Sequence, residues 1–199
     1  MNKPIQLTTP LSAASVRKLK INDLVVLTGT IYTARDMAHL KLKELEESGK
    51  GLPEALEGSV IFHAGPVVRK TDAGFSLLTI GPTTSIRMEP HSDFLGRLGV
   101  RVIVGKGGLG EGSSRALQKY GMAYLLAAPG CGVLHAQAVK QVKRVHWLEE
   151  MGMPEAIWVL EVVEWGPLMV GMDSYGNSIF QTIKEEGLKK LDSLVRDWK

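Results

Sequence analysis

Short apolar segments, rich in Val, Ile and Leu and bounded by Gly, Pro or polar residues, recur along the whole chain. Runs of about four to eight residues of this kind are typical of buried strands. Strands are predicted at residues 24–29, 59–65, 75–80, 100–104, 122–127, 156–163, 168–172 and 178–180. Gly29 and the pair Gly166-Pro167 are expected to end the strands before them, because both residue types interrupt regular structure. A chain with so many short strands must build its core around a sheet.

Helical spacing replaces this pattern in other parts of the chain. Residues 33–47 carry apolar side chains near one face and Lys and Glu on the other, with Thr33 placed to cap the amino terminus. Further helices are predicted at 113–120 and in the amphipathic tail, 181–199. Strands that alternate with helices, followed by hairpin-like strands, indicate an α/β fold with a mixed sheet and a C-terminal helix. We expect one domain over residues 1–199.

Charge and hydropathy argue against several classes of protein. The formal net charge of +3 is mild, and no dense run of Lys and Arg suggests a nucleic-acid binder. No apolar run approaches the roughly 20 residues of a membrane-spanning helix. The first residues lack the apolar core of a secretory signal, so a cytoplasmic location is expected.

Cys131 is the one cysteine of the chain and stands near a predicted helix start. A single cysteine excludes an internal disulfide bond. It also excludes an iron–sulfur cluster or a Cys-rich zinc site held by this chain alone, since such sites need roughly three or four close ligands. The histidines show no spacing typical of metal ligands, so no metal site is predicted in this chain. Without a paired base, Cys131 is expected to be an unreactive thiol.

A first candidate site is formed by Arg35, Asp36 and His39, where a predicted strand leads into a predicted helix. A helix amino terminus offers free N–H groups and the positive end of the dipole, and a cation there strengthens an anion site. The same cation is unfavourable for the helix, which suggests that Arg35 has another partner. Asp36 can be that partner only indirectly, since adjacent side chains diverge on a helix. A solvent-exposed Arg35 and a packed His39 are the ordinary alternative.

A second candidate follows Gly81-Pro82, where Thr83, Thr84 and Ser85 form a polar loop after a strand. Arg87 lies four residues beyond Thr83, so one helical turn would bring both side chains to the same face. Arginine binds a carboxylate through two parallel hydrogen bonds, and hydroxyl groups can add more. The ordinary alternative is a capped turn, although a cap does not need so many hydroxyl groups.

A third candidate is Lys106, in a glycine-rich turn between a strand and a helix. Gly105, Gly107 and Gly110 match the G-x-G-x-x-G pattern of dinucleotide-binding loops. The next strand ends without the acidic residue that such a fold needs, which argues against that fold. The Walker A pattern fails as well, because Val100 stands at its first glycine position and a glycine follows the lysine.

Each candidate alone favours its ordinary interpretation, but together they place Arg35, Thr83, Arg87 and Lys106 in loops at strand ends. Open α/β sheets bind their ligands at such loops. Two arginines and a lysine indicate a small dianion, most naturally a dicarboxylate.

These residues also carry a family resemblance. The blocks that carry it are residues 29–39 (GTIYTARDMAH), 62–66 (FHAGP), 81–88 (GPTTSIRM), 105–107 (GKG) and 153–162 (MPEAIWVLEV). In this order they resemble the beta subunits of class I fumarases and of the related tartrate dehydratases, over most of the chain. The resemblance implies a swivelling β/β/α domain. Residues 128–132 and Glu89 depart from the family pattern, and these departures bear on the outer pocket and the exact substrate.

In the family, a separate alpha subunit or amino-terminal domain holds a [4Fe–4S] cluster through three cysteines. The beta part closes over the substrate and supplies cations and a base. The resemblance implies that Thr83 transfers the proton and that Arg35 and Arg87 hold carboxylates. It gives lesser roles to the residues around them, namely Lys106, Thr84 and Ser85 at the substrate and Asp36 and His39 in ordering the site.

The resemblance therefore predicts the beta subunit of an iron–sulfur hydro-lyase that reversibly hydrates fumarate to (S)-malate. The chain would be inactive alone and would act in a complex with a cluster-bearing alpha subunit, expected to be a heterotetramer. One alternative is a subunit for L(+)-tartrate or a methylated dicarboxylate. A second alternative, of a different class, is a non-catalytic anion-binding module.

Overall fold

A computed structural model describes residues 3–72 and 74–196 as a mixed α/β fold. The strands are β1 (Ile5–Thr8), β2 (Leu24–Thr33), β3 (Val60–Phe62), β4 (Ala64–Thr71), β5 (Gly74–Pro82), β6 (Val102–Gly105), β7 (Ala123–Leu126), β8 (Val139–His146) and β9 (Ile157–Met172). The helices are α1 (Ala13–Val16), α2 (Asp36–Glu47), the 3-10 helix η1 (Ser85–His91), α3 (Ser92–Arg97), α4 (Glu111–Tyr120), α5 (Gly132–Ala138), α6 (Leu148–Met151) and α7 (Ile179–Arg196).

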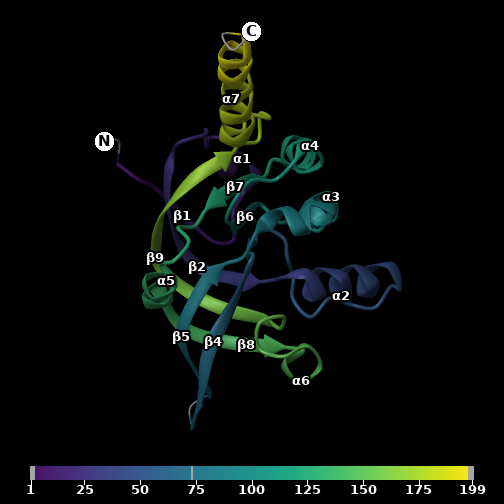
Figure 1. Ribbon diagram of the computed structural model, residues 1–199. Helices are drawn as coiled ribbons and strands as arrows, with labels where there is room; N and C mark the ends of the chain where they lie inside the picture. Colours follow the sequence, from purple (N-terminus) through teal and green to yellow (C-terminus); the bar gives the residue numbers. More distant parts are fainter. Residues whose placement is uncertain (1–2, 73, 197–199) are drawn as a thin grey trace.

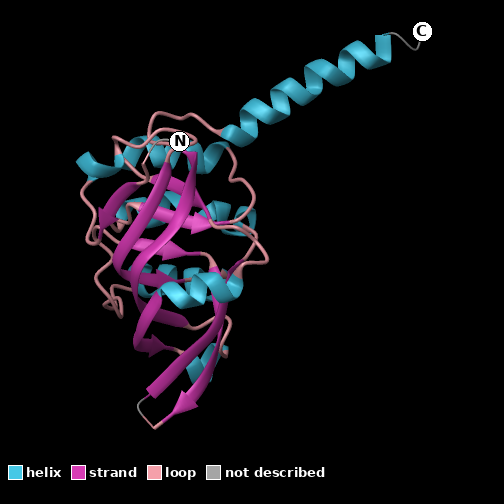
Figure 2. Cartoon of the chain, turned by 90° about the vertical axis from the view of Figure 1, so that its left-hand side faces the viewer, coloured by secondary structure: helices cyan, strands magenta, loops and turns pink. Residues whose placement is uncertain are grey.

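The main sheet has seven strands in the order β1-β2-β3-β6-β7-β9-β8. The strands from β1 to β7 in this order are parallel, whereas β9 is antiparallel to its neighbours. Because β9 also pairs with β2, the strands β2, β3, β6, β7 and β9 form a closed ring of pairings. The hairpin β4–β5 forms a separate two-stranded sheet, and its strands extend to the end of the molecule opposite α7 (Figures 1 and 2). The expected mixed sheet is therefore confirmed.

Apolar side chains on the two faces of the strands fill two separate cores. In β3, Phe62 belongs to one core together with Trp158 and Trp165, while its neighbour Ile61 belongs to the other. This division follows from the alternation of side chains along a strand. The second core is covered by α2, α3 and α4, which contribute residues such as Leu42 and Phe94.

The strands end at different residues from those that the sequence predicts. The chain continues through Gly29, where φ is 111° and the pairing with β9 shifts register, so β2 runs on to Thr33. A glycine at a bulge of this kind bends a strand without ending it. Residues 157–172 likewise form the single strand β9, which passes through Gly166 and Pro167 with register shifts in its pairing. Both predicted strand ends were wrong for this reason.

Thr33 is not the cap of α2, which begins at Asp36. The Thr33 side chain is fully buried; its hydroxyl accepts a hydrogen bond from the Trp158 N–H at 2.9 Å and lies 3.3 Å from the Ala156 carbonyl oxygen. The predicted strand at 59–65 is divided into β3 and β4, and residues 179 and 180 belong to α7 instead of a strand.

The helix α7 confirms the predicted C-terminal helix and extends away from the body of the molecule (Figure 2). Its apolar side chains Ile183, Leu188, Leu191 and Leu194 are exposed. Within residues 3–72 and 74–196, none of the helices combines the length and apolar character needed to cross a bilayer.

Candidate active site

The carboxyl ends of the parallel strands bring several predicted site residues to one edge of the sheet. Arg35 follows β2 and Lys106 follows β6, while β3 lies between these strands and leads into His63. Ligands of α/β sheets bind outside the carboxyl ends of the strands. The sequence therefore positions Arg35 and Lys106 on the side of the sheet where a substrate would be expected.

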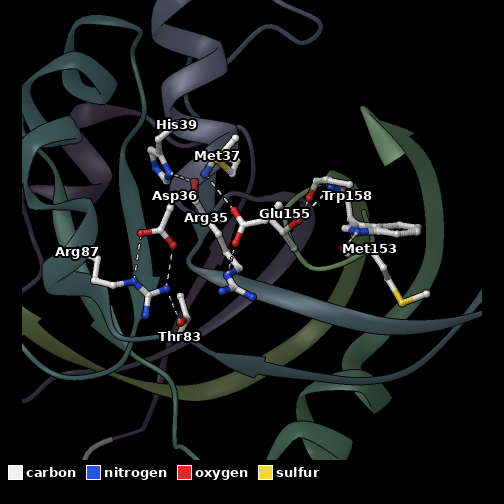
Figure 3. A network of polar contacts seen from close by, with 11 residues as sticks. Arg35, Asp36, Met37, His39, Thr83, Arg87, Met153, Glu155 and Trp158 are labelled. Carbon is white, nitrogen blue, oxygen red and sulfur yellow. Dashed lines mark hydrogen bonds and ion pairs between the residues drawn. The ribbon is translucent and has the colours of Figure 1, made fainter. Parts of the chain in front are cut away.

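Arg87 joins the second candidate segment to the first. Its Nε and Nη2 donate to the Asp36 carboxylate at 3.1 and 2.9 Å, and Nη2 also donates to the Thr83 hydroxyl at 3.0 Å (Figure 3). The contact with Thr83 confirms that the four-residue spacing places both side chains on one face. The hydrogen bond from Arg87 lowers the pKa of Asp36, so this carboxylate remains charged over a wide pH range. Asp36 thus has a direct contact with the site.

Arg35 is the residue immediately before α2 and finds its partner far along the chain. Its Nε lies 3.1 Å from Oε1 of Glu155, in the segment before β9. His39, one turn into α2, donates from Nδ1 to the carbonyl oxygen of Arg35 at 2.7 Å. The side chains of Arg35 and Arg87 extend to the same side of the α2 amino terminus, with Thr83 between them (Figure 3). The sequence analysis anticipated a partner for Arg35 but did not identify Glu155.

The buried His39 of α2 contacts two other histidines, the buried His63 and the half-buried His91. The His39 ring stacks on His91 with 5.1 Å between centroids and meets His63 edge-on at 5.3 Å. Burial lowers the pKa of His39 to about 4 and holds that of His63 well below its ordinary value. In addition, Nε2 of His39 and Nε2 of His63 have no hydrogen-bond partner among the described residues, so nothing there would stabilise a second ring proton. These two rings are therefore neutral at physiological pH.

Because of these neutral histidines, we expect the free energy of unfolding to fall at a mildly acidic pH, before most carboxylates are protonated. Since His39 is neutral in the folded state but has an ordinary pKa of 6.5 when unfolded, unfolding takes up a proton below that pH. The stability contributed by His39, up to about 3 kcal/mol, is complete above pH 6.5 and lost as the pH falls towards about 4. Urea unfolding across this range should show the decline, and His39→Gln should make it shallower. An equal slope in the variant would contradict this origin.

Hydrogen bonds connect the turn that carries Lys106 to the loop of Thr83, Thr84 and Ser85. Ser85 N–H donates to the Lys106 carbonyl at 3.1 Å, and the Tyr124 hydroxyl lies 2.9 Å from the Gly107 carbonyl oxygen and 3.0 Å from Ser85 Oγ. A Cβ atom on Gly105 would lie 1.9 Å from Ser85 Oγ, so only glycine allows this approach. Ser85 is fully buried, and in this structure its side chain holds two loops together. Sequence reasoning did not foresee the role of Tyr124.

A cavity of about 460 Å³ lies beside Lys106. Its lining comprises Thr84, Lys106, Gly107, Leu126, Ala127, Ala128, Pro129, Pro167 and Met169. The predicted site residues therefore form two neighbouring groups: Thr84 and Lys106 line the cavity, whereas Arg35 and Arg87 do not. The adjacent residues Thr83 and Thr84 connect the two groups.

The glycine-rich turn does not offer a helix end to a phosphate. The Glu89 carboxylate accepts hydrogen bonds from the Gly110 N–H at 2.8 Å and the Ser113 N–H at 2.9 Å, as well as from the Ser113 hydroxyl. A Cβ on Gly110 or Gly112 would lie 3.0 Å from a Glu89 oxygen. These glycines therefore make room for Glu89, which occupies the amino terminus of α4 in place of an external anion. Glu89 belongs to this cap and does not line the cavity.

Comparison with known proteins identifies the family. The family model described as fumarase C-terminus matches residues 1–183. The chain belongs to the fumarase C-terminus family. The match includes each of the residues discussed at the site, from Arg35 and Asp36 to Lys106 and Glu155. The resemblance seen in the sequence is confirmed.

Relatives within this family carry two kinds of name. The beta subunit of L(+)-tartrate dehydratase from Escherichia coli K12 is 40% identical over 96% of this chain and 94% of its own length. A Methanocaldococcus jannaschii protein, provisionally named as such a beta subunit, is 45% identical over 93% of this chain and 95% of its own. A Geobacillus stearothermophilus protein, provisionally named class I fumarate hydratase, is 39% identical over 94% of this chain but only 35% of its own length. This fumarase C-terminus chain thus corresponds to a whole subunit in some relatives and to part of a longer chain in another.

Proposed function

We propose that the chain is the beta subunit of a hydro-lyase that reversibly hydrates fumarate to (S)-malate. An alpha subunit would be its partner, in a complex that we propose to be a heterotetramer. The names of the relatives support the subunit role, since those matched along nearly their whole length are beta subunits. The longer class I fumarate hydratase supports the reaction class, because it joins a similar segment to further residues in one chain.

The observation that carries the proposal is the double contact of Arg87 with Asp36 and Thr83. A threonine hydroxyl is a very weak acid, so it can transfer a proton only where its alkoxide is stabilised. The Nη2 of Arg87, 3.0 Å from Thr83 Oγ1, places a fixed positive charge at that oxygen. In a closed site from which water is excluded, such a charge stabilises an anion far more than it does in water. We therefore assign proton transfer to Thr83, with Arg87 as its electrostatic support.

The guanidinium groups also retain donors for substrate carboxylates. The hydrogen bonds of Arg87 to described residues use Nε and Nη2, and the contact of Arg35 with Glu155 uses Nε. Within the described part of the chain, both Nη groups of Arg35 and the Nη1 group of Arg87 are then left for a ligand. We propose that these groups hold one carboxylate of the substrate and that Lys106, on the cavity beside Thr84, attracts the other end.

The residues of this chain do not fit a [4Fe–4S] cluster. Cys131 is its one cysteine, and in the part of the chain that the structure describes no three His, Cys, Asp or Glu side chains form a metal-binding group. We propose that the alpha subunit carries the cluster. The part of this chain is to bind the dicarboxylate, to supply the Thr83 hydroxyl and to cover the site.

The walls of the cavity favour fumarate and malate over tartrate. Apart from Thr84, Lys106 and Gly107, the lining is apolar. Tartrate carries one hydroxyl group more than malate, and a hydroxyl buried without a hydrogen-bond partner is unfavourable. L(+)-tartrate is the second candidate, favoured by the names of the relatives that match along their whole length.

Kinetics of the reconstituted complex test this proposal. The chain is coexpressed with its alpha subunit and purified without oxygen, and kcat/KM is measured for fumarate, (S)-malate, L(+)-tartrate and a methylated fumarate. We expect the highest value for fumarate and no turnover by the isolated chain. A higher kcat/KM for L(+)-tartrate than for fumarate would identify tartrate as the substrate instead. An inactive complex, together with dicarboxylate binding by the isolated chain, would instead indicate a non-catalytic module.

A further inference from the structure

We propose that Glu155 is a positioning residue that fixes the guanidinium of Arg35 for substrate binding. This inference rests on the proposed function and adds to it a residue from the opposite part of the chain. Glu155 belongs to the turn between α6 and β9, whereas Arg35 follows β2. The fold brings these segments together because β9 pairs with β2 along most of its length.

Each oxygen of the Glu155 carboxylate has its own partner. Oε1 lies 3.1 Å from Arg35 Nε, and Oε2 accepts a hydrogen bond from the Met37 N–H at 3.0 Å (Figure 3). The side chains of Arg35 and Glu155 are only 25% and 18% exposed, so solvent screens the pair weakly. A carboxylate held at both oxygens cannot rotate freely. Among the described residues the Arg35 Nε–H has no hydrogen-bond partner, so Glu155 holds the guanidinium through its charge, 3.1 Å from Nε. The Nη groups are then directed away from Glu155.

Glu155 also resolves the electrostatic problem that Arg35 creates at a helix end. The amino terminus of α2 carries partial positive charge, and Arg35 stands immediately before its first residue without a side-chain cap. The Glu155 carboxylate supplies negative charge there and accepts one of the free N–H groups of the first turn. Without it, repulsion from the helix end and the loss of the ion pair at Nε would favour an Arg35 side chain turned towards solvent.

The turn that carries Glu155 is held rigidly on both sides. The indole N–H of the buried Trp158 donates to the Met153 carbonyl at 2.9 Å, and the Thr33 hydroxyl lies 3.3 Å from the Ala156 carbonyl oxygen. On the outer side, a Cβ on Gly65 would lie 2.6 Å from the Pro154 carbonyl oxygen, so β4 packs closely against the turn. Groups that position a ligand-binding side chain need such a fixed support. Because this turn is fixed against β4 and β9, the Glu155 carboxylate has a fixed position next to Arg35.

The contact between Glu155 and Arg35 involves fewer guanidinium nitrogens than the contact between Asp36 and Arg87. Asp36 accepts hydrogen bonds from both Nε and Nη2 of Arg87, whereas Glu155 forms an ion pair at Nε of Arg35, which has no hydrogen bond among the described residues. Glu155 can thus orient Arg35 without competing for the two Nη groups that a substrate carboxylate would bind. Its loss should weaken substrate binding more than turnover.

The test uses Glu155→Gln in the complex with the alpha subunit. Glutamine keeps an oxygen for the Met37 N–H but removes the charge, so the variant should fold. We expect KM for fumarate to rise about ten- to hundredfold with a smaller change in kcat. Glu149→Gln, an exposed glutamate on the neighbouring helix α6, is the matched control and should behave as wild type. Wild-type kinetics for Glu155→Gln would overturn the inference.

A double variant separates positioning from a merely structural role. In the Arg35→Ala background, Glu155→Gln should cause no further rise in KM, because the residue through which Glu155 acts is absent. An equal additional loss in that background would overturn the inference. A wild-type complex without any hydro-lyase activity would instead overturn the proposed function, and the inference with it.

Discussion

Replacement of Arg87 by alanine in the alpha–beta complex is expected to lower kcat/KM for fumarate about a thousandfold. Two effects combine in this loss. The substrate carboxylate loses a charged donor, and the Thr83 oxygen loses the cation 3.0 Å away that stabilises its alkoxide. We therefore expect KM to rise and kcat to fall together, which steady-state kinetics of the variant would measure.

The fold should survive this substitution. The side chains of Arg87 and Asp36 are 43% and 39% exposed, so Asp36 can be solvated when its partner is removed. Arg87→Lys keeps the charge but loses the paired hydrogen bonds to Asp36, and should recover only part of the activity. Arg97→Ala is a matched control, because Arg97 also pairs with surface carboxylates but lies away from the site on α3. Wild-type kinetics for Arg87→Ala would remove Arg87 from the site.

Local spacing predicted the contacts that depend on neighbouring residues. The four-residue interval between Thr83 and Arg87 is enough to place their side chains together, whatever the rest of the chain does. The position of Arg35 at a helix end was likewise evident from the change in periodicity. Its need for a partner followed from the helix dipole, but the identity of Glu155 depends on the pairing of β2 with β9, which no local pattern encodes.

Register shifts explain why sequence analysis missed β8 and misplaced the ends of β2 and β9. Within β8 the apolar residues Val139, Val142 and Val145 recur at intervals of three, because the pairing with β9 shifts register between them. A spacing of three resembles neither the alternation of a regular strand nor a full helical face. Gly29 and Gly166 were predicted to end strands for a related reason: a bulge and a strand end use the same residue type.

The buried polar contacts could not be predicted from the residues that make them. Ser85 was interpreted as a substrate contact because it follows two threonines in a loop. The structure instead buries it between Tyr124 and His63, whose Nδ1 lies 3.0 Å from its hydroxyl oxygen. Glu89 similarly caps α4, although it lies far before this helix in the sequence. In each case the deciding partner belongs to another element, so only the assembled fold reveals the role.

Thr83→Val is expected to reduce kcat for fumarate hydration by about a hundred- to ten-thousandfold with little change in KM. Valine has nearly the same shape as threonine but lacks the hydroxyl that we assign to proton transfer. Arg87 would keep both hydrogen bonds to Asp36, so the carboxylate-binding groups should remain in place. Exchange of the C3 proton of malate for solvent deuterium, measured in the malate that is recovered without dehydration, would report deuterium incorporation by the proton-transfer step itself, and it should fall in parallel with kcat.

Two neighbouring variants make this prediction specific to the Thr83 hydroxyl. Thr83→Ser restores a hydroxyl at the same position and should recover most of the turnover. Thr84→Val removes the adjacent hydroxyl, which lines the cavity beside Lys106, and should raise KM while kcat stays close to that of the wild type. If Thr83→Val retains wild-type turnover and deuterium incorporation, the proton must be transferred by another group. Arg87 would then act on the substrate alone, and its contact with Thr83 would only hold the loop in place.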